Sequence, residues 1–450
     1  MKKIASILRN KEIMNRILFT VLILFIFRIG AQITVPGVNP EGLEEYLNSG
    51  SALSLMNLLG GGTLQTFSIF ALGVSPYITA QIIVQLLSTD VLPALSELKR
   101  QGQYGRRKIE YATRYLTLML GAVQAYGIIK TIENTDNVTL NLDGNWMTYI
   151  YIIVVMLAGS MLVMWLGDQI SVKGIGNGIS MIIFAGIVCS LPNQFSTAFA
   201  TYISSAQGQP EATVIAGVFK FILYCLAYLV IIAFVTFIEL SQRKIPVQHS
   251  GKSGGQTPGM TKASFLPIKI NSAGVIPVIF ASSIMMAPSV IAAFIDSNSS
   301  NAQWLKIFST SEMYDMGSWS MPWGLIIYLV LTIAFTFFYA NLQIDPEQIA
   351  ENFQKNGSYI PGIRPGNETE RYIRKVLNRV TCIGALALAF IAALPPILTM
   401  SGIFGANGQA LALGGTGLII VVGVALELNS QIDGLLAGKS FDEVVAGGGQ

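Results

Sequence analysis

Residues that commonly carry chemistry are few and scattered in this sequence. His249 is the one histidine, and Cys189, Cys225 and Cys382 lie far apart in apolar stretches, without CxxC or Cys/His spacing. Zinc sites and disulfide frameworks need such residues at close, characteristic spacings. The sequence therefore predicts neither a metal site nor a disulfide framework, and we interpret the cysteines as small apolar side chains.

Catalytic and nucleotide-binding patterns are not found either. The histidine lies in a predicted loop, and the apolar segments contain no pair of aspartates of the kind that an intramembrane protease needs. Gly174, Gly176 and Gly178 fail the GxGxxG pattern, because Ile179 stands where the third glycine is required. A turn at the start of a helix explains these glycines better. We therefore expect no enzyme activity and no catalytic residues.

The composition indicates a membrane protein. Of 450 residues, 52% are hydrophobic and only 12% are charged, and the mean hydropathy is +0.57. A soluble core does not need so large an apolar fraction. A basic N-terminal stretch precedes the first apolar segment, but Arg28 interrupts that segment before any cleavage site. We interpret the segment as a first membrane helix and not as a secretory signal.

Ten segments are apolar enough to cross a bilayer, since a spanning helix needs about 20 mostly apolar residues. They lie near residues 17–35, 71–90, 115–133, 148–167, 177–195, 213–238, 272–294, 322–342, 376–398 and 412–429. The sequence therefore predicts an all-α polytopic membrane protein with ten transmembrane helices.

The positions of basic residues predict the topology. If the N-terminus is cytoplasmic, all but four of the 28 lysines and arginines fall on the cytoplasmic side, and the exceptions are Arg28, Lys130, Lys220 and Lys306. Cytoplasmic loops of membrane proteins carry such an excess of Lys and Arg. We therefore expect both termini to be cytoplasmic.

Residues 51–70 are apolar, yet in this topology both of their ends lie outside, so they cannot span. Gly60, Gly61 and Gly62 interrupt the segment. Non-helical backbone is tolerated at membrane depth where protein surrounds it, which predicts a re-entrant plug. The alternative is a helix lying flat on the outer leaflet, although the segment lacks the charged face of such a helix.

Two predicted cytoplasmic loops, 239–271 and 343–375, are long, basic and rich in Gly and Pro. Long loops commonly carry function. In the second loop, the sequence IPGIRPG presents Arg364 on a stiff tip, because two prolines fix φ and two glycines permit tight bends. Such a tip suits docking to RNA or to an acidic protein surface. The alternative is that these charges only anchor the topology.

A series of motifs, in order and with matching spacing, resembles the SecY family in its bacterial form along nearly the whole chain. They are FRIGAQITVPGV (Phe27–Val38), GGGTLQTFSIFALGVSPYITAQIIVQLL (Gly60–Leu87), GRRK (Gly105–Lys108), TRY (Thr113–Tyr115), MWLGDQI (Met164–Ile170), GIGNGISMIIFAGIV (Gly174–Val188), QRK (Gln242–Lys244), LPIKINSAGVIPVIFASSIM (Leu266–Met285), YIPGIRPG (Tyr359–Gly366) and GGTGLIIVVGVALE (Gly414–Glu427). Val74 departs from the isoleucine common at its position, and the tail after Glu427 matches little.

The resemblance implies a channel subunit that translocates unfolded secretory polypeptides and releases transmembrane segments into lipid. Its fold would be a clamshell of two five-helix halves, related by an inverted pseudo-repeat around a pore. We expect an N-terminal half at 1–195, a hinge region at 196–212 and a C-terminal half at 213–450. The resemblance implies no cofactor, and energy would come from SecA, the ribosome and the proton-motive force.

The resemblance also implies partners and a location. SecE and SecG would be the membrane subunits, and the SecA ATPase and the ribosome would share the cytoplasmic face, with rRNA contacting the loops. Signal peptides and nascent chains would be passengers, and YidC, SecDF and bilayer lipid are further expected partners. The protein would be multi-pass in the cell (inner or plasma) membrane.

Four groups of residues are expected to form the functional sites. The pore ring is predicted at Val74 and Ile78, at Ile179 and Ile183, each pair one helical turn apart, and, by resemblance, at Ile279 and Ile420. The plug is predicted at Asn57, Leu58, Leu59, Gly60, Gly61, Gly62, Thr63, Leu64 and Phe67. The lateral gate is predicted at Thr79, Ile82, Gln85, Asn271, Ser282 and Ser283. Docking of SecA or the ribosome is predicted at Arg106, Arg107, Arg243, Lys244 and Arg364. The alternative for each ring residue is ordinary core packing.

A secondary transporter is the main alternative function. Transporters carry ionisable residues near the membrane midplane. Asp90, Asp168 and Glu427 fall at or near helix ends, which leaves Arg28 within the first span. A single cation is a poor ion-coupling site, although an arginine can face a water-filled funnel or backbone carbonyls. We interpret Arg28 as structural.

Overall fold

The computed structural model describes residues 10–36, 38, 43, 57, 60–88, 95, 97–98, 101–133, 146–203, 211–249, 264–295, 307–308, 314–315, 320–400 and 408–447. Ten helices correspond one by one to the ten predicted spans. They are α2 (Lys11–Gly30), α5 (Ser75–Leu86), α7 (Gln103–Glu133), α8 (Trp146–Lys173), α9 (Gly178–Tyr202), α10 (Glu211–Leu240), α11 (Ile276–Ile295), α13 (Trp323–Gln343), α15 (Asn367–Met400) and α16 (Gly408–Gly447). Among the described residues, eight helices are long and apolar enough to cross a membrane individually. Helix α5 has 12 residues, and in α11 the segment Ile276–Met285 is a shorter apolar helix by the same measure.

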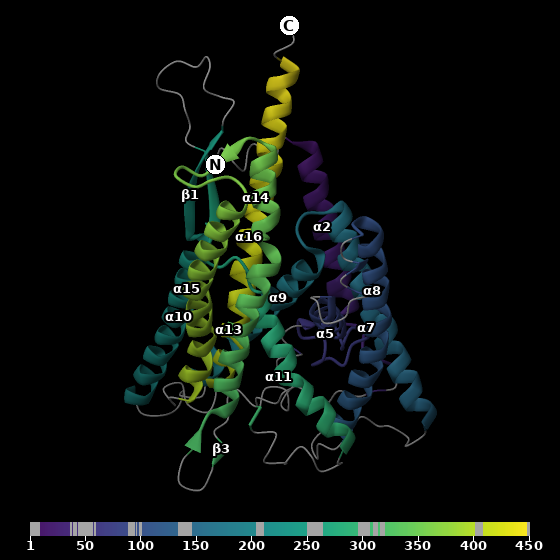
Figure 1. The fold of residues 1–450 in the computed structure, drawn as a ribbon. Coiled ribbons are helices and arrows are strands. Elements are labelled where there is room, and N and C mark those ends of the chain that lie inside the picture. The colour runs from purple at the N-terminus through teal and green to yellow at the C-terminus, as the bar shows by residue number, and fades with distance from the viewer. Residues whose placement is uncertain are drawn as a thin grey trace.

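In chain order we group α2 to α9 as the first set and α10 to α16 as the second; α2, α7 and α8 lie on one side of the molecule, and α10 and α15 lie on the other (Figure 1). In the first set, α5 packs on α7, α7 on α8, and α8 on both α2 and α9. In the second set, α13 packs on α11 and α15, and α16 packs on α10 and α15. The two sets meet where α9 contacts α10 and α16, and where α5 and α7 contact α11. The division of the chain into an N-terminal half, a hinge region and a C-terminal half remains a prediction.

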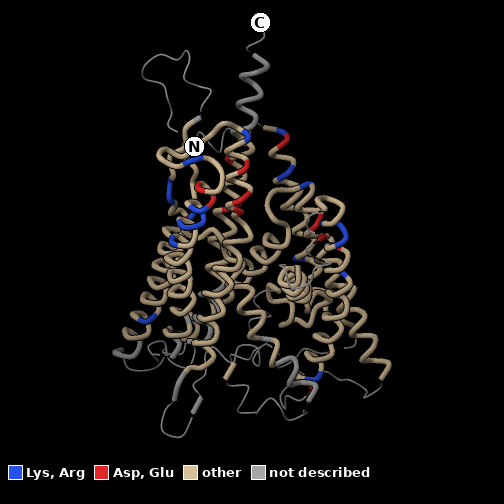
Figure 2. Tube along the Cα trace, in the orientation of Figure 1, with Lys and Arg blue, Asp and Glu red and all other residues tan. Residues whose placement is uncertain are grey.

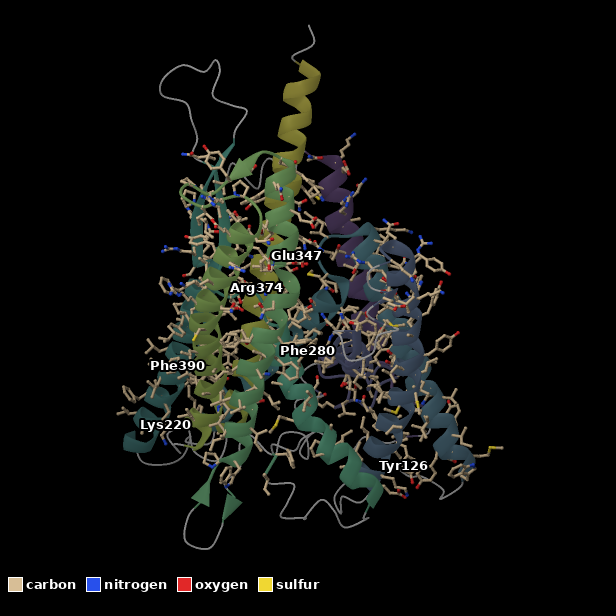
Figure 3. The ribbon with its side chains drawn as sticks, viewed as in Figure 1. Tyr126, Lys220, Phe280, Glu347, Arg374 and Phe390 are labelled. Carbon is tan, nitrogen blue, oxygen red and sulfur yellow. The ribbon has the colours of Figure 1, made fainter. Side chains whose placement is uncertain are left out.

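Charged residues gather at one end of the molecule, which we call the basic end (Figure 2). The first turn of α2 and the last turns of α16 lie at this end (Figure 1). Arg374 lies toward it, whereas Lys220 lies near the opposite end (Figure 3). Large apolar side chains such as Phe390 are exposed on the outer sides of helices. This combination, with apolar flanks and charged ends, is what a bilayer requires of a spanning bundle.

The two basic loops fold into one small unit that the sequence analysis did not predict. Strand β1 (Gln242–His249) pairs antiparallel with β2 (Ser264–Lys269) and with the short β5 (Ser358–Tyr359). Helix α14 (Pro346–Lys355) precedes β5. A second, two-stranded sheet, β3 (Tyr314–Asp315) with β4 (Ser320–Met321), lies at the opposite end. The fold is thus helical in the membrane, with short strands added at its two ends.

A separate apolar cluster joins the three-stranded sheet to the first turns of α15. We call it the loop core, and its members are Ile245, Ile268, Ile360, Ile373, Leu377 and Val380. Along β1, Ile245 and Val247 are buried while Pro246 and Gln248 are exposed. This alternation is the signature of a strand with one covered face. The loop core fixes both basic loops on one support.

The glycines at 174–178 form a turn at the head of α9, as the sequence predicted. Gly176 has a φ of +88°, which glycine adopts without strain. Asn177 is the N-cap, and its side-chain oxygen accepts hydrogen bonds from the Ile179 and Ser180 amides at 3.1 and 3.5 Å. Gly178 lies directly against the backbone of Gly167 on α8, so a side chain has no room there.

Candidate functional site

Residues 60–74, the described stretch directly before α5, are folded into the interior of the helical bundle. Thr63, Leu64 and Phe67 are completely buried. Asn57 organises the segment, because its carbonyl accepts a hydrogen bond from the Gly62 amide at 2.8 Å and its side chain accepts one from the Gln65 amide at 3.0 Å. The other predicted plug residues, Leu58 and Leu59, lie outside the described residues. The described part is buried in protein and does not lie flat on an outer surface.

The C-terminal part of this segment, Thr66–Phe70, is fixed to the chain just after α2, and we call it the plug base. The Val35 amide donates to the Phe67 carbonyl at 3.0 Å, and the Ile69 amide donates to the Ile33 carbonyl at 2.9 Å. The Phe70 ring stacks on Phe27 with centroids 5.8 Å apart. The plug base is therefore held by several backbone bonds and an aromatic contact.

The N-terminal part, Gly60–Gly62, is held differently, and we call it the plug tip. Gly61 and Gly62 have φ values of +76° and +82°, a backbone region that favours glycine. Gly61 also lies against Gly186 of α9, with backbone touching backbone, and a Cβ atom on Gly186 would lie 2.6 Å from the Gly61 Cα atom. Neither position accepts a side chain without moving the plug tip.

Arg28 contacts the plug tip from the last turn of α2. Its Nη1 atom donates a hydrogen bond to the Gly61 carbonyl at 3.1 Å, across 33 positions of sequence. The side chain is partly buried. Arg28 thus faces a backbone carbonyl. The sequence had suggested either this or a water-filled funnel as its environment.

The predicted pore ring comes from four separate parts of the chain. Val74, Ile78, Ile183, Ile279 and Ile420 are all buried in one apolar cluster. Ile78 donates its amide to the Val74 carbonyl at 3.0 Å, so these two residues lie one turn apart at the start of α5. Ile179 is only partly buried, and its side chain lies near Gly167 on α8. A role in a ring remains a prediction for all six residues.

The predicted gate residues make hydrogen bonds of two kinds. The Gln85 side chain on α5 lies close to the Tyr339 hydroxyl on α13, so it reaches between the two sets of helices. Asn271 donates to Glu239 of α10 at 2.5 Å and to the Gly274 carbonyl at 3.0 Å, both within the second set. The three gate residues that carry hydroxyl groups donate to backbone carbonyls of their own helices. Thr79 donates to the Ser75 carbonyl, and Ser282 and Ser283 both donate to the Ile279 carbonyl. Ile82 is buried on α5.

The predicted docking residues all lie in exposed positions. Arg106 and Arg107 are in the first turns of α7, and Arg243 and Lys244 are on β1. Lys244 lies over the Phe265 ring of β2, 4.8 Å from its centroid. Arg364 is at the tip of the IPGIRPG turn, where its carbonyl accepts a hydrogen bond from Thr369 at 2.8 Å. The loop core therefore supports Arg243 and Lys244 beside the turn that carries Arg364.

Sequence reasoning missed several contacts of these sites. Tyr339 and Glu239 were not singled out, because an isolated tyrosine or glutamate near a helix end gives no signal of its partner. Gly186 was quoted within a motif but not recognised as a contact of the plug tip. A pair of glycines, one in the plug and one on a helix, is the only pattern that could have pointed to it.

A model of the SecY family matches residues 68–429. The chain belongs to the SecY family. Two relatives named protein translocase subunit SecY are those of Lactococcus lactis subsp. lactis (strain IL1403) and Bacillus subtilis (strain 168). The first is 41% identical over 441 residues, covering 98% of this chain and 97% of the relative. The second is 42% identical over 440 residues, covering 98% of each.

Solved structures show the same fold at low sequence identity. A protein-conducting channel has a TM-score of 0.64 at 18% identity, covering 94% of this chain and 93% of the other. A SecY structure, described as one whose plug domain stabilises the closed channel and maintains a membrane seal, has a TM-score of 0.63 at 18% identity, covering 94% and 92%. Sec61 in a canine ribosome-channel complex has a TM-score of 0.62 at 17% identity, covering 94% and 93%. The chain is therefore a multi-pass membrane protein of a family whose relatives are named protein translocase subunits, and it has the fold of protein-conducting channels.

Proposed function

We propose that unfolded polypeptide passes between the two sets of helices and that the plug tip closes this path at rest. The observation that carries the proposal is the glycine-rich segment turned back into the bundle, buried against α2 and α9. It occurs in a chain whose relatives are named translocase subunits. A buried segment with a fixed base and a lightly held tip can leave the path without unfolding the helices around it.

The pore ring is the proposed constriction of this path. Its side chains are branched and aliphatic, and all six belong to or pack on one apolar cluster. An apolar constriction excludes ions by dewetting. It also offers no polar atoms that would bind a passing peptide. Val74, Ile78, Ile183, Ile279 and Ile420 are the residues whose burial best suits this role, and Ile179 suits it least.

The contact of α5 with α11 is the proposed lateral gate. Hydrogen bonds between membrane helices contribute about 0.6 kcal/mol on average, so a seam with few such bonds can open for an apolar signal helix. Gln85 crosses between the halves, and the remaining gate residues support α5 and α11 from within. The hinge is proposed at 196–212, beside the packing of Phe195 on Tyr224 and Tyr228. Residues 204–210 of this region lie outside the described residues.

The basic end is proposed to face the cytoplasm, in the cell (inner or plasma) membrane. The excess of Lys and Arg at that end supports this orientation. SecA and the ribosome are proposed to dock there, on Arg243, Lys244, Arg364, Arg106 and Arg107. The likeness to Sec61 in a ribosome-channel complex supports a ribosomal partner. SecE and SecG are the proposed membrane partners, and YidC and SecDF are proposed associates.

Reconstitution tests the proposed function. The chain is purified with SecE-like and SecG-like subunits, inserted into proteoliposomes and supplied with SecA, ATP and an unfolded preprotein. We expect the preprotein to become protected from added protease, and a tightly folded passenger to remain accessible as the control. Absence of small-subunit co-purification together with ion-coupled uptake of a small solute would indicate a transporter instead.

A further inference from the structure

The plug is attached to the rest of the protein in two unequal ways. The plug base is fixed by the backbone bonds of Phe67 and Ile69 and by the Phe27–Phe70 stack. The plug tip meets α9 where the Gly61 backbone lies against the Gly186 backbone, and it receives a side-chain bond from Arg28. The Gly62 amide also bonds the Asn57 carbonyl within the plug segment, and Gly60 lies near Gly73. Among the described hydrogen bonds of the plug tip, the Arg28 bond is the one that comes from a membrane helix.

Arg28 is an unusual group to place beside an apolar segment. An arginine at membrane depth is costly and normally pairs with other polar groups or faces water. Within the described part of the chain, no ion pair involves Arg28, and its hydrogen-bond acceptor is the Gly61 carbonyl. A neutral side chain would fold here at lower cost, so folding alone does not account for the arginine.

We propose that Arg28 is a positioning residue for the plug, whose guanidinium holds the Gly61 carbonyl and keeps the plug tip in its closed place. The proposal rests on the proposed function, because it names the residue that keeps the polypeptide path between the two sets of helices closed. Release of one hydrogen bond to a charged group frees the plug tip, while the plug base stays attached. The absence of side chains at Gly61 and Gly186 leaves no interlocking contact to hinder the movement.

The expected size of the effect follows from the kind of bond. A hydrogen bond to a charged group shifts an equilibrium by about 10- to 100-fold. Arg28→Met keeps a long apolar side chain and removes the charge and the donors, so the fraction of open channels should rise by about this factor. Arg28→Lys keeps a charge and a donor on a shorter side chain, and its effect should be smaller than that of Arg28→Met.

Resting ion conductance in planar bilayers is the measurement, with each variant purified together with its small membrane subunits. Arg16→Met is the matched control, because Arg16 lies on the same helix and pairs with exposed Glu12 at 3.3 Å, away from the plug. A channel lacking residues 57–67 supplies the conductance of an unplugged path. We expect Arg28→Met to approach the unplugged channel and Arg16→Met to remain like the wild type.

Gly186→Ala provides a second, independent route to the same state. Its Cβ atom would lie 2.6 Å from the Gly61 Cα atom, so it should displace the plug tip and raise conductance. Because both changes release the same tip, Arg28→Met should add little to Gly186→Ala. Multiplicative effects of the two substitutions would contradict the proposal, as they would mean that Arg28 acts on another part of the channel.

The outcomes separate this proposal from the proposed function. Wild-type conductance in Arg28→Met, beside raised conductance in the plug deletion, overturns the role of Arg28 and leaves the channel intact. If the plug deletion also has low conductance and the wild type transports no preprotein, both the role of Arg28 and the proposed function are overturned. A lowered melting temperature of Arg28→Met with unchanged conductance identifies Arg28 as merely structural and also overturns the proposal.

Discussion

Gln85 on α5 lies close to Tyr339 on α13, beside the proposed lateral gate, and we propose that a hydrogen bond between the two side chains ties the halves together. Gln85→Leu and Tyr339→Phe each remove it, and we expect each to let less hydrophobic signal sequences open the channel. At about 0.6 kcal/mol for such a bond, the shift should be about threefold. The measurement is export efficiency over a series of signal sequences of graded hydrophobicity.

The double variant of Gln85 and Tyr339 is the control for this prediction. If one shared bond is responsible, the double variant should behave like either single variant. Asn271→Leu should differ from them, because Asn271 bonds Glu239 within the second half and its loss leaves a partly buried carboxylate without that donor. An unchanged hydrophobicity threshold in both Gln85→Leu and Tyr339→Phe would show that the seam is held by packing alone.

Arg364 stands exposed on a turn whose shape is set by glycines with φ values of +82° at Gly362 and +100° at Gly366. Arg364→Glu should weaken SecA or ribosome binding by at least about tenfold, since like-charge contacts cost several kcal/mol. The melting temperature should not change. Lys355→Glu on neighbouring α14 is the matched charge reversal, and equal losses in both variants would mean that only net charge matters. Equilibrium binding of SecA and of ribosomes measures the effect.

The pore ring makes a prediction through paired substitutions. Ile183→Ser with Ile279→Ser places two hydroxyls among buried aliphatic side chains from α9 and α11. A wetted constriction conducts ions, so resting conductance should rise several-fold, most clearly when the plug is also deleted. Ile383→Ser with Leu386→Ser, at positions 61% and 60% exposed on α15, is the matched control. If the double serine variant with the plug deleted still shows low resting conductance, the constriction lies elsewhere.

At the scale of elements, the loop core predicts that the two basic loops act as one unit. Leu377 is fully buried there, and Leu377→Ala should cost about 2–5 kcal/mol of local stability. The sheet should then open, so that trypsin cleaves at Arg243 or Lys244 although the substitution lies on α15. Exposed Lys375→Ala on the same helix should leave the cleavage pattern unchanged. Normal protection in Leu377→Ala would mean that the two loops are independent.

The sequence predicted the helices well because lipid imposes a simple length and polarity requirement on each span. The same requirement explains the errors. Helix α16 covers 40 residues, or about 60 Å at 1.5 Å per residue, and its charged end beyond the membrane carries no hydropathy signal. The three-stranded sheet was missed because β5 has two residues and its partner β1 lies far away in sequence. The Ile245/Val247 alternation was the available signal.

The candidate sites were predictable as residue types but not as contacts. Gly60–Gly62 and the branched aliphatic residues were identified from composition and motif. The bond from Arg28 to Gly61 was not, because it depends on how the intervening residues return to α2. Asn271 was assigned to the seam as an amide near a helix start, but its partner Glu239 is set by the packing of α10.

At the scale of the whole molecule, the prediction is a single orientation in the membrane. With native cysteines replaced, a cysteine at Asn301 or Asn407 should react with an impermeant thiol reagent from outside the cell. A cysteine at Gly357, between α14 and β5, should react only after the membrane is opened. Asn301 and Asn407 lie outside the described residues, so the test depends on topology alone. Labelling of the Gly357 position in intact cells would reverse the assignment.

The contact of Gly61 with Gly186 has a thermodynamic consequence. Parting two glycine backbones exposes very little apolar side-chain surface, and the heat-capacity change of a transition follows that surface at about 0.45 cal/K/mol per Å². Withdrawal of the plug tip should therefore have a heat-capacity change near zero. Its van't Hoff plot should be close to a straight line, unlike the curved dependence of a transition that unpacks a hydrophobic core. The equilibrium between the closed and the withdrawn plug tip should therefore be similar at low and at high growth temperatures.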